Sequence, residues 1–193
     1  MQHLKWKKKQ QGSALIIALI WAALFQVVAF YALEWAQGER ARRFYEAESV
    51  GLLQVQRALT QYAQANQAAF KAGKEIMFIN NQFAPTIADL QTQGFLTASG
   101  SEVMAPWGQT YATMLTLQGT GAITGVVYLT GNITDATGNP DRIHACNVAA
   151  TLHEIGVCTP PNDAGRLGNA YTQIPNPSGA PAAVGALVSI PPS

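Results

Sequence analysis

The strongest constraint on this 193-residue chain is an uncharged run from Ser13 to Leu33, in which Gln26 is the one amide side chain. An α-helix rises 1.5 Å per residue, so about 21 residues reach across the roughly 30 Å hydrocarbon layer of a bilayer. Four lysines and then Gly12 come directly before the run. We therefore expect a membrane helix to which the rest of the chain is attached.

The residues after this run favour a helix that is retained over a signal that is removed. A secretory signal has an apolar core of about 7–15 residues and then a small-x-small cleavage site, whereas this run is longer and no such site follows Leu33.

Residues 34–70 contain no proline, which predicts one helix from Ser13 to about Phe70, weakened at Gly38 and Gly51. Its apolar stripe should pack against a head domain and consists of Leu52, Val55, Leu59 and Tyr62.

Small side chains recur every three or four residues along the membrane part of the predicted helix. The residues that share this face are Ala14, Ala18, Ala22, Gln26 and Ala29. Such a face lets a second helix approach closely in lipid, and an amide on it can hydrogen-bond across the contact. Alanine is also simply common in apolar helices, so the pattern has two interpretations.

The charge pattern argues against nucleic acid as a partner. The net charge is +1, and outside the lysines before Gly12 the basic residues gather only at Arg40, Arg42 and Arg43. These arginines lie among glutamates, which favours a solvated helix face or a charge register between helices over a ligand site. The glutamates are Glu34, Glu39, Glu46 and Glu48.

The two cysteines of the chain, Cys146 and Cys158, are a dozen residues apart. A pair at this distance is natural as a disulfide in an oxidising compartment, and closing so short a loop stabilises a fold by about 3 kcal/mol in the chain-entropy model. We therefore expect the part of the chain after the helix to lie in the periplasm or outside the cell.

Beyond the long helix, which should end near Gly73, the pattern predicts short elements. A strand is expected over residues 75–79, a short helix capped by Thr86 and ending at Gly94, and a hairpin of strands 109–117 and 124–130. A third strand is expected over 143–148 and a helix over 149–155. The result is an α+β fold, a long helix packed on a small antiparallel sheet.

The end of the chain, residues 159–193, is rich in Pro, Gly, Asn and Ala, with one apolar run from Ala182 to Ile190. Three interpretations are open: a short terminal strand, a linker before a larger module, and a divergent tip.

Residue patterns for catalysis or metal binding are weak throughout. The spacings of His144, Cys146, His153 and Cys158 match no strong zinc pattern, and a disulfide would remove both sulfurs. The oxygen-rich stretch Asp135–Asp141 is faintly similar to a calcium loop, but it lacks the closing glutamate and favours a surface turn. Trp107 and Tyr111 are candidates either for an exposed binding surface or for the core. We therefore expect no enzyme, no metal and no cofactor.

A basic leader ending in glycine, an apolar run starting directly after it and a helix that continues beyond the membrane together resemble a type IV prepilin. The resemblance implies that a prepilin peptidase of the inner membrane cuts between Gly12 and Ser13 and leaves the helix in place. The family usually has Phe or Met as the first mature residue and Glu as the fifth, where this chain has Ser13 and Ile17. A subunit without that buried carboxylate is less well specified for repeated addition, which favours a minor subunit.

Two further stretches are similar to the constant region of shufflon-type minor pilins of the PilV type, from type IVb conjugative thin pili. They are residues 87–96 and 106–111, and the order of elements agrees from Gly12 to Leu129. The resemblance implies the type IV pilin fold, a place at the tip or start of a pilus, other pilin subunits as partners and contact with the surface of a recipient cell.

These expectations divide the chain into a leader 1–12, a membrane half of the helix 13–33, a periplasmic half 34–72, a globular head 73–158 and a tail 159–193. The alternatives are an uncleaved bitopic inner-membrane protein with a periplasmic domain, and a major pilin or pseudopilin of a related system.

Overall fold

The computed structural model describes residues 3–97, 108–135 and 137–192, without the side chains of residues 3–14, 37, 40–42 and 44. The chain divides into two compact units, Met1–Phe44 and Tyr45–Ser193, and we call the second unit the head. Helix α1 runs from His3 to Ala65 and so belongs to both. The sequence suggested one boundary after Leu33 and another after residue 72. The boundary between the two units lies between these positions, inside α1 and after Phe44.

The long helix ends earlier than Phe70, the end expected from the sequence. Asn66 follows the last residue of α1, and its side chain donates to the Tyr62 carbonyl oxygen at 2.9 Å. A side-chain amide that competes for a helix carbonyl in this way favours a break. A short helix α2, Gln67–Lys71, then leads to Gly73, whose φ of 63° provides the expected left-handed cap.

The described residues of the head form one antiparallel sheet of six strands in the order β1-β2-β6-β3-β4-β5. The expected α+β class is therefore confirmed, and so is the expected hairpin, formed by β1 and β2. The strands are β1 Tyr111–Leu117, β2 Ile123–Leu129, β3 Gly156–Cys158, β4 Arg166–Gly168, β5 Gln173–Pro175 and β6 Val184–Ile190.

Residues 159–193 are not a separate tail. They supply β4, β5 and β6, and β6 lies in the middle of the sheet between β2 and β3. Ile190 pairs with Ile123 of β2, and Ala186 pairs with both Val127 of β2 and Gly156 of β3. The apolar run seen in the sequence is therefore the strand that joins the two halves of the sheet, and the Pro- and Gly-rich residues around it form turns of the head.

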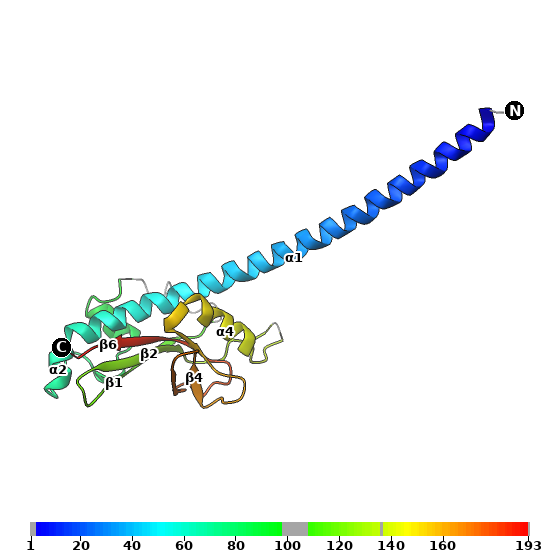
Figure 1. Ribbon diagram of the computed structural model, residues 1–193. Coiled ribbons are helices and arrows are strands. Elements are labelled where there is room, and N and C mark those ends of the chain that lie inside the picture. The colour runs from blue at the N-terminus through cyan, green and yellow to red at the C-terminus, as the bar shows by residue number, and fades with distance from the viewer. Residues whose placement is uncertain (1–2, 98–107, 136, 193) are drawn as a thin grey trace. The chain divides into compact units, whose positions relative to one another are not determined.

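The two faces of the sheet carry separate clusters of buried residues. One face meets the stripe on α1, whose four residues Leu52, Val55, Leu59 and Tyr62 are all 0–1% exposed. The other face carries a smaller cluster that includes Val126, Val157 and Leu167. In Figure 1 the part of α1 drawn in cyan lies along the strands β6 and β2.

The segment between α2 and the sheet contains one short helix and no strand among its described residues. Helix α3 spans Ile87–Thr92, and Thr86 forms a capping box with Asp89, as the sequence predicted. The strand expected over residues 75–79 is wrong. The Ile79 N–H donates to the Ile76 carbonyl oxygen, and Phe78 has a φ of 65°, so these residues form a turn.

The third strand expected at residues 143–148 is also wrong, because helix α4 spans Arg142–Thr151. The Asp141 carboxylate caps this helix by accepting from the His144 N–H at 2.9 Å. Its buried residues follow the helical period and are Ala145, Val148 and Ala149. Of the helix expected over 149–155, residues 149–151 are helical as the last residues of α4, and a single 3₁₀ turn, His153–Ile155, then leads into β3.

Helix α4 is fastened to the sheet at β3. The expected disulfide between Cys146 and Cys158 is confirmed, and it links α4 to the last residue of β3. At Gly156 a Cβ would overlap the Ala149 carbonyl group, with its carbon only 2.7 Å away. The close approach of helix and strand therefore requires glycine at this position.

Gly51 offers a test of how tightly α1 packs in the head. A Cβ there would overlap the Tyr111 hydroxyl and lie 3.1 Å from its Cζ. Replacing helical glycine by alanine normally stabilises by about 1 kcal/mol, but here we expect Gly51→Ala to lower the free energy of unfolding by about 1–3 kcal/mol through overpacking. Denaturant unfolding of the full chain in detergent measures this value.

The matched control is Gly38→Ala in the same helix, where a Cβ would meet no described atom within 4 Å. This variant should unfold at the wild-type denaturant concentration or slightly above it. Equal stability of the Gly51 and Gly38 variants would show that the helix and Tyr111 do not pack as described.

The disulfide offers a second test. Replacing both Cys146 and Cys158 by alanine should lower the free energy of unfolding by about 3 kcal/mol, because the unfolded chain regains the freedom of the closed loop. Thiol titration of the denatured chain without reductant should find no thiol in the wild type and one in Cys146→Ser. A titratable thiol in the wild type would contradict the pairing.

Candidate functional site

Two regions of the chain have properties that packing of the head does not explain, and the first is the apolar part of α1. Among the described residues, Leu15–Ala36 is the one helical segment long and apolar enough to cross a membrane, with 22 residues. Its large side chains are open to the surroundings, as the exposure of Trp21 (68%) and Phe25 (75%) shows. This segment overlaps the run Ser13–Leu33 that the sequence predicted to lie in lipid.

The small-residue face is part of this exposed segment. Ala18, Ala22 and Gln26 are exposed and Ala29 is half-buried, so the face is open to a second helix. Gln26 also lines a shallow depression with Ala23, Val27, Phe30 and Tyr31. The side chains of Ser13 and Ala14 are not described. The backbone of both residues, and of Gly12 at the expected cleavage site, is helical.

The second region is a buried polar contact between α1 and α4. Glu48 was expected on a solvated helix face, but its exposed fraction is 3%. It lies four residues before Leu52, so it continues the buried stripe of α1 by one turn toward the N-terminus. Arg43, by contrast, forms an exposed pair with Glu39 four residues before it, at 3.1 Å, as a solvated face should.

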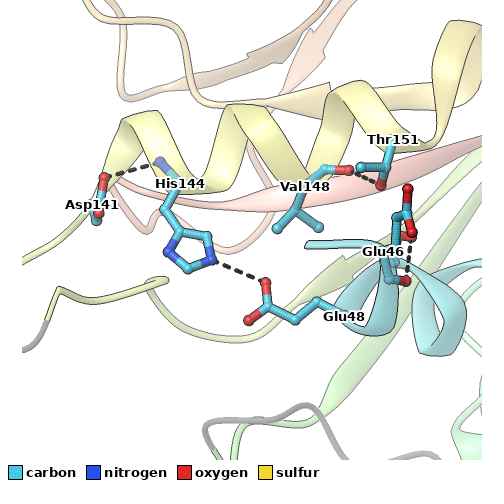
Figure 2. A network of polar contacts seen from close by, with 7 residues as sticks. Glu46, Glu48, Asp141, His144, Val148 and Thr151 are labelled. Carbon is cyan, nitrogen blue, oxygen red and sulfur yellow. Dashed lines mark hydrogen bonds and ion pairs between the residues drawn. The ribbon is translucent and has the colours of Figure 1, made fainter. Parts of the chain in front are cut away.

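His144 of α4 is the partner of Glu48. Its Nε2 lies 3.1 Å from Glu48 Oε2, and Figure 2 shows the carboxyl group pointing toward the imidazole ring. The ring of Tyr45, one turn before Glu48, meets the imidazole edge to face with ring centroids 4.7 Å apart. The backbone of His144 is fixed by the Asp141 cap, so two helices and a cap together place this ring.

Burial controls the protonation of the pair. Loss of solvation raises the pKa of Glu48 from 4.5 to about 8. Loss of solvation also lowers the pKa of His144, and the nearby Asp141 offsets part of that change. Both shifts favour the uncharged forms, so we assign the proton to Glu48 at neutral pH. Its Oε2–H then donates to the neutral imidazole Nε2, and the contact is a hydrogen bond between neutral groups.

The surroundings of the pair are aromatic and closed. Burial raises the pKa of Tyr111 to about 12, with a smaller contribution from Glu48. Glu48 Oε1 is buried and has no hydrogen-bond partner among the described residues. A buried carboxyl group with one oxygen that accepts no hydrogen bond costs stability.

Comparison of the chain with protein families, curated proteins and solved structures finds no match. The chemistry of the two regions is therefore argued from their residues alone.

The residues considered for metal binding do not come together. In the described part of the chain no group of three or more His, Cys, Asp and Glu side chains is placed to hold a metal ion. Asp135 Oδ1 accepts the backbone N–H groups of Thr137 and Asn139 at 2.8 and 2.9 Å, which is the geometry of a polar turn. Tyr111 belongs to the core, and Trp107 lies outside the described residues.

The sequence contains a pattern that could have indicated that Glu48 is buried, although the alternation of charges around it suggested a solvated face. Glu48, Leu52, Val55, Leu59 and Tyr62 step by four, three, four and three, so the carboxylate shares the face of the apolar stripe. The sequence gives no comparable indication for His144. Residues 143–148 are expected to form a strand, in which His144 would have other neighbours than in the helix α4.

The pair predicts how stability depends on pH. Between pH 4.5 and about 8 the folded chain keeps a proton on Glu48 that the unfolded chain has lost, so stability falls as pH rises. His144 acts in the opposite sense below pH 6.5, where the unfolded chain binds the extra proton. We therefore expect a net fall from pH 6.5 to 8, of at most about 1.4 kcal/mol per pH unit, in denaturant titrations of the full chain in detergent.

The control variants are Glu48→Gln and Glu46→Gln, the second at an exposed position on the same helix. Glu48→Gln should abolish the fall between pH 6.5 and 8, whereas Glu46→Gln should keep it. A wild-type stability that rises through this range would show that Glu48 is ionised in the folded chain.

Proposed function

We propose that the chain is a minor subunit of a type IV pilus of the type IVb conjugative kind, built on the type IV pilin fold. The observation that carries the proposal is that two segments of α1 have different surroundings. Its segment Leu15–Ala36 is apolar and open, whereas its stripe from Leu52 to Tyr62 is buried in the α+β head. One helix thus offers a surface to lipid or to other helices and also holds a folded domain.

Further support comes from the start of the chain. The lysines and Gly12 directly precede the apolar segment, as a prepilin leader requires, so the proposed cut falls between Gly12 and Ser13. After the cut the helix stays in the inner membrane until it packs against the helices of other pilin subunits. The face of Ala14, Ala18, Ala22, Gln26 and Ala29 would then lie at a helix contact.

The place of the subunit in the pilus follows from Ile17. A filament protein added many times would gain from a carboxylate at this position to pair with a neighbour's amino terminus, because an unpaired charge is costly in lipid. An apolar residue here supports a subunit used at the tip or at the start of assembly. The head would then be presented outward, toward the surface of a recipient cell.

Maturation gives the decisive test. In cells with an active prepilin peptidase, the intact mass of the membrane-extracted chain should correspond to Ser13–Ser193, and in cells without the peptidase to the whole chain. Gly12→Ala should leave the leader uncut, because the peptidase reads the glycine before the cleaved bond. Gly38→Ala, a glycine replacement in the same helix, should be processed like the wild type.

A chain that keeps Met1 in the presence of active peptidase would contradict the proposal. It would favour the uncleaved bitopic protein, whose helix pairs in the membrane through the same small-residue face.

A further inference from the structure

Helix α1 enters the head at a turn that contacts α4. Tyr45 is the first residue of the head unit, and Glu48 lies one turn later. Both contact His144 of α4: the ring centroids of Tyr45 and His144 are 4.7 Å apart, and Glu48 Oε2 lies 3.1 Å from His144 Nε2. The buried stripe of α1 starts only at Leu52. We call Tyr45, Glu48 and His144 the entry contact.

Both helices are also anchored away from the entry contact. The stripe holds α1 against the sheet, and the residues at its two ends, Leu52 and Tyr62, are 1% and 0% exposed. The disulfide between Cys146 and Cys158 holds α4 to β3. His144 lies in the first turn of α4, before the disulfide. The entry contact can therefore open while the sheet, the stripe and the disulfide stay in place.

The entry contact has no net charge only while it holds a single exchangeable proton. A protonated Glu48 beside a neutral His144 is uncharged, and a carboxylate beside an imidazolium sums to zero. Loss of the proton leaves a negative charge on a carboxyl group that is 3% exposed. A neutral imidazole with its proton on Nε2 can still donate to that carboxylate, but the net charge stays buried, which is costly.

The titratable groups around the entry contact do not compensate a negative charge. In the described part of the head these groups are Tyr45 on α1, Tyr111 on β1 and the capping carboxylate Asp141 at the start of α4, which Figure 2 shows beside His144. Strand β6, in the middle of the sheet, contains no titratable residue. Arg142 of α4 donates to two backbone carbonyl oxygens outside that helix.

We propose that the entry contact is a proton-dependent latch, which holds the first turn of α1 in the head against α4 while it carries one proton and releases that turn when the proton is lost. The latch goes beyond the proposed function and does not depend on it. It assigns a response to pH to the turn at which α1 enters the head.

The direction of the response follows from proton linkage. The released turn loses the proton of Glu48 near its ordinary pKa of 4.5, whereas burial raises the pKa in the closed contact to about 8. Each rise in pH between these values therefore favours the open form, and the effect levels off above pH 8. Charging of His144 in the open form opposes this change below pH 6.5.

The test measures access to His144 in the full chain in detergent. Diethyl pyrocarbonate acylates accessible neutral imidazole, and mass spectrometry of peptides gives its rate at each histidine. His153, which is exposed, is the internal reference and cancels the ordinary titration of imidazole. The rate at His144 relative to His153 should rise about tenfold between pH 6.5 and 8.5 in the wild type.

Two variants connect this rise to Glu48. Glu48→Gln is neutral at every pH, so its ratio should stay flat between pH 6.5 and 8.5. Glu46→Gln, at an exposed position on the same helix, should show the rise of the wild type. A flat ratio in the wild type, or an equal rise in Glu48→Gln, would overturn the latch.

A second measurement on the wild type distinguishes local opening from unfolding of the head. Oxidation of Tyr45 by hydroxyl radicals, relative to Tyr171, which is 81% exposed, should rise over the same pH range. Tyr62, which is 0% exposed, should stay unoxidised. Oxidation of Tyr62 in step with Tyr45 would show that the head opens as a whole, and it would remove the latch. If Glu48→Gln itself exposes Tyr62, the wild-type measurement decides.

Discussion

The head depends on the burial of one face of α1 against the sheet. Leu52, Val55, Leu59 and Tyr62 are almost completely buried, and each side chain of this size contributes about 1.5–3 kcal/mol when removed from water. The sheet that covers them is complete only when β6, from the end of the chain, lies between β2 and β3. Gln56 of α1 donates to the Leu187 carbonyl oxygen of β6 at 3.0 Å, so helix and central strand are also joined directly.

A second set of links holds α4 in place and includes the least expected residue of the core. The disulfide ties α4 to β3, and the hydrogen bond between His144 and Glu48 ties α4 to α1. Burial of Glu48 is tolerated because its raised pKa keeps the group neutral at physiological pH. One carboxyl oxygen without a partner among the described residues makes this contact less favourable than an apolar one.

The apolar segment of α1 has exposed side chains, as the proposed assembly into a pilus requires. The segment Leu15–Ala36 can be covered by lipid or by other helices, and both coverings are used in turn by a subunit that leaves a membrane for a filament.

Local patterns in the sequence determined the elements whose signals lie within a few residues of each other. The apolar run of α1, its buried stripe, the Thr86 cap and the β1–β2 hairpin could all be predicted, because helix and strand periods and capping are short-range properties. The disulfide was also within reach, since the chain has two cysteines.

Only the tertiary structure decided the rest, and in each case a distant partner was the reason. Within the apolar run that begins at residue 182, Val184–Ile190 became a central strand because β2 and β3 pair with both of its edges. Residues 143–148 became helical because the face of Ala145 and Val148 is buried in the main core against residues far away in the sequence, and the local Asp141 cap adds to this effect. Glu48 and His144 are 96 positions apart, and no period in a sequence records a contact over that separation.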